Sequence, residues 1–228
     1  MHELLLSAYG AQHWWPAQSA FEMILGAYLT QNTSWMAVEK TLENLRQAEL
    51  LSLAGIRRVS LRRLQHLIRP SGFYTRKASA LKAFVSFLDE HCEGSLEIMA
   101  QIPTMQLRPL LLKLPGVGRE TADAMLLYAF GNPVPVVDEY LRRMLSRHHI
   151  MHPAPGHDKN SYEAMAGVVR KAFATDPESA QVSLFNEFHA LVVAVGKAHC
   201  SRQPNCAGCP LAADLQYANP KGAEQWQS

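Results

Sequence analysis

The chain has 228 residues and a mass of 25.4 kDa, which is room for one large domain or two small ones. Hydrophobic residues make up 48% of it, enough to bury a core and too many for an intrinsically disordered protein. The 22 basic and 20 acidic residues nearly cancel, so the net charge of +2 indicates no partner by itself. Three of the four cysteines gather near the C-terminus, a pattern unlike a secreted disulfide framework.

Features of targeting and membrane insertion are absent from the sequence pattern. Nowhere is there an apolar stretch of about 18 residues, so we expect no membrane span. The first residues, Met1 to Leu6, have no basic region and no long apolar region, so we expect no signal peptide. Together with the scarce cysteines, this predicts an intracellular protein of the cytoplasm.

Apolar residues recur at helical spacing through almost the whole chain. The first stripe runs from Phe21 to Leu29, and Ser19 with Glu22 ahead of it is typical of a capping box. Val134–Val137, the one strand-like run, is short and contains a proline. The sequence therefore predicts an all-α fold. In chain order, the later stripes cover residues 61–68, 81–88, 107–114, 122–129, 137–145 and 184–195.

Basic residues are concentrated between Leu50 and Leu88, where the chain has eight of them and no acidic residue. Such a run is usually a solvated face, and it favours nucleic-acid binding only where a second phosphate-binding feature accompanies it. The run consists of Arg57, Arg58, Arg62, Arg63, Arg69, Arg76, Lys77 and Lys82.

A second feature of this kind lies at residues 114–118, Leu-Pro-Gly-Val-Gly, between two helical stripes. Two glycines after a proline allow a tight turn whose N–H groups point outward, and the next helix would begin at about Arg119. That geometry suits one DNA phosphate and carries no base information. The alternative is an ordinary turn between two helices.

Residues 114–125, Phe130-Gly-Asn-Pro133 and Val136-Val137-Asp138 together resemble the helix-hairpin-helix DNA glycosylases of the endonuclease III superfamily. The resemblance covers residues 21–209. It implies a six-helix barrel over residues 20–133 that carries the hairpin, and a second helical domain from residues 1–19 and 134–228. It also implies that a monomer binds double-stranded DNA and flips a damaged base into the cleft between the domains. The expected DNA contacts are Gln31, Leu114, Gly116, Val117, Gly118, Arg119 and Thr121.

The family places an aspartate about twenty residues after the hairpin glycines, and Asp138 stands at that position here. Breaking an N-glycosidic bond develops positive charge on the sugar, which a carboxylate stabilises while it activates the attacking water. The resemblance therefore implies that Asp138 is catalytic. The alternative is an aspartate that only caps a helix.

Glu120 occupies the position at which bifunctional members of the family carry a lysine. A carboxylate forms no Schiff base with the sugar, so lyase activity is in doubt and a monofunctional glycosylase is expected. One alternative is the same fold acting on an oxidised pyrimidine or a mismatched base. A non-catalytic lesion-binding protein is another.

The segments Trp14-Trp15-Pro16, 29–35 and 68–74, followed by Lys77, resemble those of the 3-methyladenine DNA glycosylases, as does Glu120. The resemblance implies a base pocket of Trp14 or Trp15 with Trp35, and Glu120 nearby. Electron-rich indoles stack well on a cationic alkylated purine. Gln31 would fill the gap left in the duplex. Alternatively, the tryptophans are structural and Gln31 bonds a helix end.

Cys200, Cys206 and Cys209 stand where many family members hold a [4Fe–4S] cluster. The first gap is one residue shorter than the family pattern, and Leu215 occupies the fourth position. Three readings stay open. Asp214, His199 or a small molecule completes a cluster; a three-cysteine zinc site forms with a histidine; or the loop folds without metal.

Overall fold

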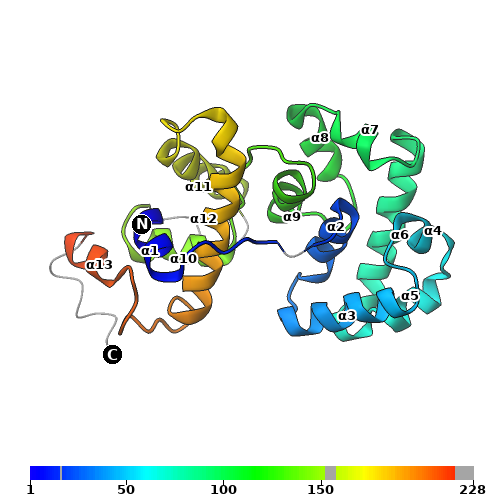
Figure 1. Ribbon diagram of the computed structural model, residues 1–228, viewed down its shortest axis with the longest axis horizontal. Helices are drawn as coiled ribbons and strands as arrows, with labels where there is room; N and C mark the ends of the chain where they lie inside the picture. Colours follow the sequence, from blue (N-terminus) through cyan, green and yellow to red (C-terminus); the bar gives the residue numbers. More distant parts are fainter. Residues whose placement is uncertain (16, 152–157, 219–228) are drawn as a thin grey trace. The chain divides into compact units, whose positions relative to one another are not determined.

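A computed structural model describes residues 1–15, 17–151 and 158–218. The chain divides into two compact units, one formed by Ala17–Asn132 and the other by Met1–Pro16 together with Pro133–Ser228 (Figure 1). Over the described residues the regular elements are all helical, which confirms the predicted all-α fold. None of these helices has the length and apolarity needed to cross a membrane.

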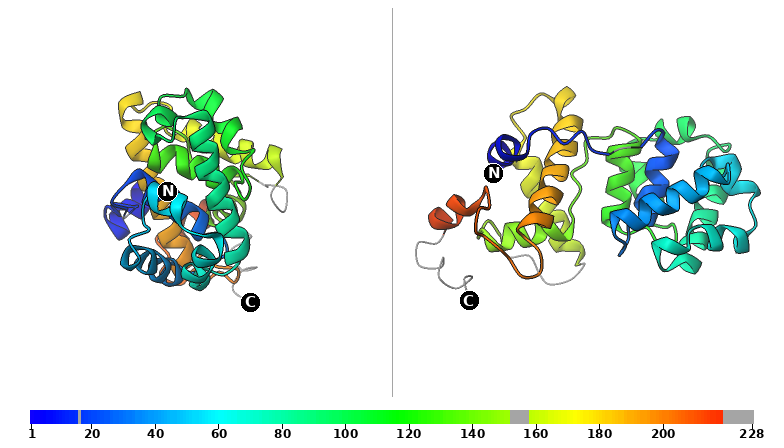
Figure 2. Two further views of the ribbon diagram at one scale, coloured as in Figure 1. Left: turned by 90° about the vertical axis from the view of Figure 1, so that its right-hand side faces the viewer. Right: turned by 60° about the horizontal axis from the view of Figure 1, so that its bottom comes forward.

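In the unit of residues 17–132, helix α2 (Ala20–Leu29) is the central element and contacts α3, α6, α9 and the π-helical turn η2 (Figure 2). Residues 21–29 of α2 are buried without exception, as expected for a helix surrounded by others. The other elements are α3 (Trp35–Gln47), α4 (Leu53–Arg58), α5 (Leu61–Leu67), η1 (Arg69–Ser71), α6 (Tyr74–His91), α7 (Leu96–Ala100), α8 (Thr104–Leu111), α9 (Arg119–Ala124) and η2 (Met125–Ala129).

The predicted capping box at the start of α2 is formed in half. Ser19 Oγ accepts the Glu22 N–H at 3.1 Å, as predicted. The reciprocal bond differs, since the Glu22 carboxylate accepts the N–H of Gln18 at 3.2 Å and pairs with Arg46 at 3.2 Å. Glu22 thus joins the start of α2 to the last turn of α3.

In the other unit, the long helix α12 (Glu178–Ala198) packs against α1 (His2–Tyr9) and α10 (Glu139–Arg147). The predicted stripe 137–145 starts before the helix does: residues 134–137 are non-helical and Asp138 is the N-cap of α10. Val136 and Val137 are buried, so the segment that leads into α10 is held against the core. The unit is completed by α11 (Lys159–Ala172) and α13 (Ala212–Ala218).

Candidate nucleic-acid interface and active site

The predicted hairpin is present between α8 and α9, and α9 begins at Arg119 as expected. Gly116 has φ +76°, a left-handed conformation that glycine adopts without strain. Val117 N–H donates to the Leu114 carbonyl at 3.2 Å and closes the turn. The side chains of Leu114 and Val117 are buried, so these two residues present only main-chain groups to a partner.

Gly118, the N-cap of α9, needs no glycine for its backbone, because its φ is −90°. A Cβ at this position would meet no heavy atom within 4 Å. Gly118 supplies no side-chain cap to the first turn of α9, where main-chain N–H groups point out of the helix end. The missing side chain at Gly118 leaves the backbone open to close approach.

A buried ion pair joins the two helices of the hairpin. Arg108 on α8 donates from Nε and Nη2 to the two carboxylate oxygens of Asp123 on α9, at 2.6 and 2.9 Å. The Asp123 side chain is 1% exposed and that of Arg108 is 22% exposed. Bidentate geometry of this kind fixes both position and angle, so the pair holds the hairpin in shape.

Gln31, just after α2, lies against the hairpin. Its Nε2 donates to the Gly116 carbonyl at 2.7 Å and to Thr121 Oγ1 at 3.0 Å. The alternative of a hydrogen bond at a helix end is therefore met in part, because Thr121 belongs to the first turn of α9. Insertion of Gln31 into a duplex would require both bonds to open.

Lys77 leaves the predicted basic face and is buried at 5% exposure. Its Nζ donates to the Leu29 carbonyl at 2.8 Å and to Thr33 Oγ1 and the Ser71 carbonyl at 2.7 Å. The ammonium thus holds the turn after α2 against η1. A run of basic residues does not show which of them is buried, so the run did not distinguish Lys77 from its exposed neighbours.

The rest of the basic run is only partly open. Arg57 pairs with Asp89 on α6, and Lys82 donates to the carbonyls of Ile56 and Arg57. Arg62, Arg63 and Arg76 are exposed. A smaller group of cations than the sequence suggested is therefore placed to meet a polyanion.

The candidate base-pocket residues are half-buried tryptophans with partners of their own. Trp35, the first residue of α3, donates from Nε1 to Glu39 Oε1 at 2.7 Å. The rings of Trp14 and Trp15 lie 5.2 Å apart, and Lys197 Nζ lies 5.9 Å from the Trp14 ring. Glu120, in the first turn of α9, is exposed.

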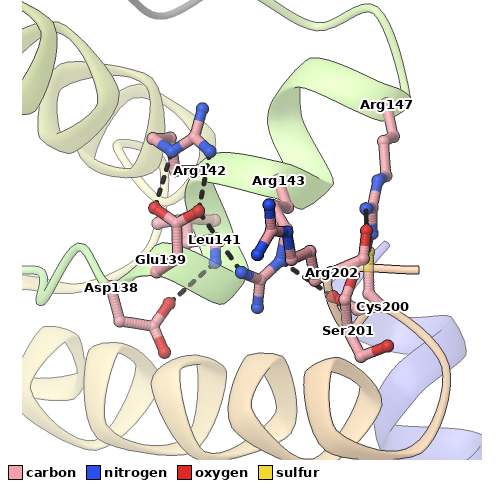
Figure 3. Close-up of polar contacts among 9 residues, drawn as sticks. All are labelled: Asp138, Glu139, Leu141, Arg142, Arg143, Arg147, Cys200, Ser201 and Arg202. Carbon is pink, nitrogen blue, oxygen red and sulfur yellow. Dashed lines mark hydrogen bonds and ion pairs between the residues drawn. The ribbon is translucent and has the colours of Figure 1, made fainter. Parts of the chain in front are cut away.

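Asp138 caps α10 and is 8% exposed. Its Oδ1 accepts the Leu141 N–H at 2.7 Å, while the carboxylate faces helix α12 (Figure 3). Burial raises the pKa of this carboxyl to about 6, against the opposing effects of the Leu141 N–H and the Arg143 charge. The group is ionised at neutral pH with a pKa in the range useful for a general base. Capping uses one oxygen and leaves the second for chemistry.

His189 is a buried neighbour of this carboxylate that sequence reasoning missed. Its Nε2 lies 3.9 Å from Asp138 Oδ2, and burial lowers the pKa of the imidazole to about 4. The sequence signal was weak, because His189 sits inside the apolar stripe of residues 184–195 with no motif around it. Only the packing of α12 on α10 brings the two side chains together.

Helix α10 also anchors the cysteine loop (Figure 3). Arg143 Nε donates to the Cys200 carbonyl at 2.9 Å. One turn later, Arg147 donates to Cys200 Sγ at 3.0 Å and to the carbonyls of Ser201 and Arg202 at 2.9 and 3.0 Å. These bonds satisfy main-chain carbonyls of a loop that has no regular structure of its own.

Of the three readings of the cysteine loop, the cluster and the zinc site need ligands that come together. Burial is the largest cause that raises the pKa of the Cys209 thiol, and the charges of Cys206 and Cys200 act in the same direction. Within the described ranges, however, no three His, Cys, Asp or Glu side chains come close enough to hold a metal ion. The guanidinium of Arg147 contacts Cys200 Sγ instead, and Leu215 offers no ligand atom.

Comparison with known proteins identifies relatives that cover most of the chain. The chain is 39% identical to a candidate DNA repair glycosylase of Methanocaldococcus jannaschii over 213 residues, 92% of each protein. It resembles the crystal structure of H. pylori 3-methyladenine DNA glycosylase bound to 1,N6-ethenoadenine with a TM-score of 0.72 and 31% identity, over 85% of this chain and 92% of that one.

A trapped endonuclease III–DNA covalent intermediate shares the fold, with a TM-score of 0.74 and 21% identity over 99% of this chain and 95% of that one. Residues 25–170, which include the hairpin and Asp138, match the sequence pattern of a single family. By this match and by the identity to its relatives, the chain belongs to the HhH-GPD superfamily of base excision DNA repair proteins.

Proposed function

We propose that this protein is a monofunctional DNA glycosylase that hydrolyses the N-glycosidic bond of alkylated purines of the 3-methyladenine type. The observation that carries the proposal is Asp138, a buried carboxylate with one oxygen held by the helix and a pKa near 6. Membership of a base excision repair family and the 31% identity to a 3-methyladenine DNA glycosylase support the choice of reaction and substrate.

Asp138 acts on the sugar side of the reaction. As the C1′–N bond breaks, the alkylated base leaves with the bonding electrons and becomes neutral, while positive charge develops on the sugar. The ionised carboxylate stabilises that charge and accepts a proton from the attacking water, giving a free base and an abasic site. Glu120 stands where an amine nucleophile would be needed, so no Schiff base forms and the strand stays intact.

Selection of the base is assigned to indole side chains, Trp14 or Trp15 and Trp35. An alkylated purine carries positive charge before the bond breaks, and an indole face attracts a cation more than a neutral base. The bond is already weak in such a substrate, so the pocket has to select rather than activate. Gln31 is assigned to the gap that the flipped base leaves in the duplex.

The cysteine loop takes part in neither step, because hydrolysis is assigned to Asp138 and phosphate binding to the hairpin. Cys200 lies against α10, where Arg143 and Arg147 bind the start of the cysteine loop. We therefore assign the loop a structural role in supporting the helix that Asp138 caps, with no reaction step on a metal.

A panel of duplexes tests the substrate. Each duplex carries one lesion: 3-methyladenine, 7-methylguanine, an oxidised pyrimidine or a mismatched thymine. We expect release of the alkylated purines and little release of the others, because only the former are cationic. Release of only the oxidised pyrimidine or only the thymine would show that the protein is a glycosylase for a different lesion. Binding of the alkylated duplex without release of any base would point to a lesion-binding protein.

The hairpin glycines give a prediction that separates folding from DNA binding. Serine at Gly118 would cap α9 with its own Oγ and occupy N–H groups that a phosphate would use. We expect Gly118→Ser to leave thermal stability unchanged or slightly raised, and to weaken DNA binding by about tenfold, equivalent to one lost charged hydrogen bond. Fluorescence anisotropy with a duplex checks the binding, and thermal unfolding checks the stability.

Gly116→Ala is the matched control, because φ at this position is +76° and a Cβ would lie 3.4 Å from Ala80 Cβ. Here we expect a loss of stability of about 1 kcal/mol. Wild-type DNA affinity in Gly118→Ser would contradict the assignment of the hairpin to phosphate binding.

A further inference from the structure

The two oxygens of Asp138 have different surroundings. Oδ1 is held by the Leu141 N–H at 2.7 Å, at the start of helix α10. Oδ2 points away from that helix and lies 3.9 Å from His189 Nε2 on α12. Both side chains are buried, with 8% and 9% exposure. The separation exceeds a hydrogen-bond distance by about 1 Å, so a hydrogen bond between the two groups requires a small movement of one side chain.

Close packing of two helices places His189 there. Gly196 follows His189 by two helical turns and lies on the same face of α12. A Cβ at Gly196 would lie 2.3 Å from the ring of Tyr140, so the first turn of α10 rests directly on α12. The same face of α12 thus meets α10 at two points: Gly196 lies against Tyr140, and the His189 imidazole lies near Asp138. The packing of α12 on α10 therefore fixes the position of His189 next to Asp138.

The groups around the pair determine its charge. From α10, Arg143 lowers the pKa of Asp138 and Glu139 raises it, while burial is the largest effect. From α11, the Tyr162 hydroxyl accepts the N–H of Val137 at 3.4 Å, next to the cap. Burial holds the imidazole neutral, with a pKa of about 4. At neutral pH an uncharged imidazole, with one N–H, therefore faces an ionised carboxylate.

We propose that His189 is a positioning residue for Asp138, donating from Nε2–H to Oδ2 so that the carboxylate keeps one orientation while the glycosidic bond breaks. The proposal rests on the function proposed above. A carboxylate with one oxygen tied to the helix still rotates about its Cα–Cβ and Cβ–Cγ bonds. A donor on the second oxygen removes that freedom and leaves lone pairs for the attacking water. His189 itself exchanges no proton.

The test compares two substitutions that differ in the donor. His189→Leu keeps an apolar volume and removes the N–H, whereas His189→Gln places an amide N–H close to the position of Nε2. Single-turnover base release is measured with saturating enzyme between pH 5 and pH 8. For His189→Leu we expect release about 10–100-fold slower, the scale of a misplaced catalytic group, with the acidic limb moved to higher pH. His189→Gln is expected to recover most of the rate, and both variants bind damaged DNA like the wild type.

Equal rates and equal acidic limbs in His189→Leu and wild type would overturn the proposal. Equal losses in the two variants, with a shared fall in thermal stability, would assign His189 to packing alone. If His189→Leu does not fold, His189→Met, a second apolar side chain without an N–H, replaces it in the comparison with His189→Gln.

A second readout needs no activity and separates this proposal from the proposed function. The difference in stability between wild type and Asp138→Asn depends on pH according to the pKa of Asp138 in the folded state. We expect His189→Leu to move that dependence to higher pH, because the ionised carboxylate loses a donor. If the wild type releases no base but this shift is found, the proposed function fails while the contact between His189 and Asp138 stands. No shift would overturn the contact.

Discussion

Replacing Asp138 with asparagine is expected to slow base release by about 10²–10⁴-fold, the contribution of a charged catalytic group, while DNA binding is retained. The same variant is expected to be more stable at neutral pH. Burial raises the pKa of Asp138 from 3.8 to about 6, so ionising the carboxyl in the folded protein costs on the order of 1–3 kcal/mol. Stability from this group therefore falls as the pH rises from 3.8 to about 6, and asparagine escapes the loss.

The matched control is Asp158→Asn. Asp158 caps α11 and accepts the Ser161 N–H at 2.7 Å, the same type of bond that Asp138 makes, but it is exposed. Asparagine is an equally good cap, so neither activity nor stability should change in this variant. Base release at the wild-type rate by Asp138→Asn would remove Asp138 from the mechanism. Equal stability changes in the two variants would contradict the cost assigned to burial.

Arg108→Met is expected to lower the free energy of unfolding by about 3–5 kcal/mol, because it leaves the carboxylate of Asp123 buried opposite an apolar side chain. That carboxylate is 1% exposed, so water cannot take over the role of the guanidinium. Since the pair joins α8 to α9, we also expect weaker DNA binding through a less ordered hairpin. Urea denaturation and duplex anisotropy measure the two effects.

Arg57→Met serves as the control for burial. Arg57 and Asp89 also form a bidentate pair, but both side chains are about 40% exposed, at 43% and 39%. Exposed pairs of this kind contribute about 0–1 kcal/mol, so a small change is expected. Similar destabilisation by Arg108→Met and Arg57→Met would show that burial of Asp123 does not determine the strength of the pair.

Local pattern predicted the elements whose stability is decided locally. Helix α2 was found from its apolar spacing and the Ser19 cap, and α9 from the hairpin that precedes it. The all-helical class followed from the same periodicity. One boundary differs: the predicted stripe begins at Val137, whereas the helix begins after Asp138, which caps α10.

Contacts between segments far apart in the chain could not be predicted from the sequence. Lys77 was one basic residue in a run of eight, and only the turn after α2, folded back on η1, makes it a buried donor. The Arg108–Asp123 pair and the contact of His189 with Asp138 depend on helix packing. Gly196 had no motif, yet its missing Cβ allows Tyr140 to lie on α12. Depth and partner choice are tertiary properties that periodicity does not encode.

A monofunctional glycosylase hydrolyses the glycosidic bond without cutting the strand, whereas a glycosylase with lyase activity also cuts it. A duplex with a single 3-methyladenine is incubated with the protein, and strand breaks are counted with and without hot alkali. We expect release of the base and breaks only after alkali, because Glu120 cannot form the Schiff base through which a lysine opens the sugar. Breaks without alkali, or a covalent adduct trapped by borohydride, would contradict it.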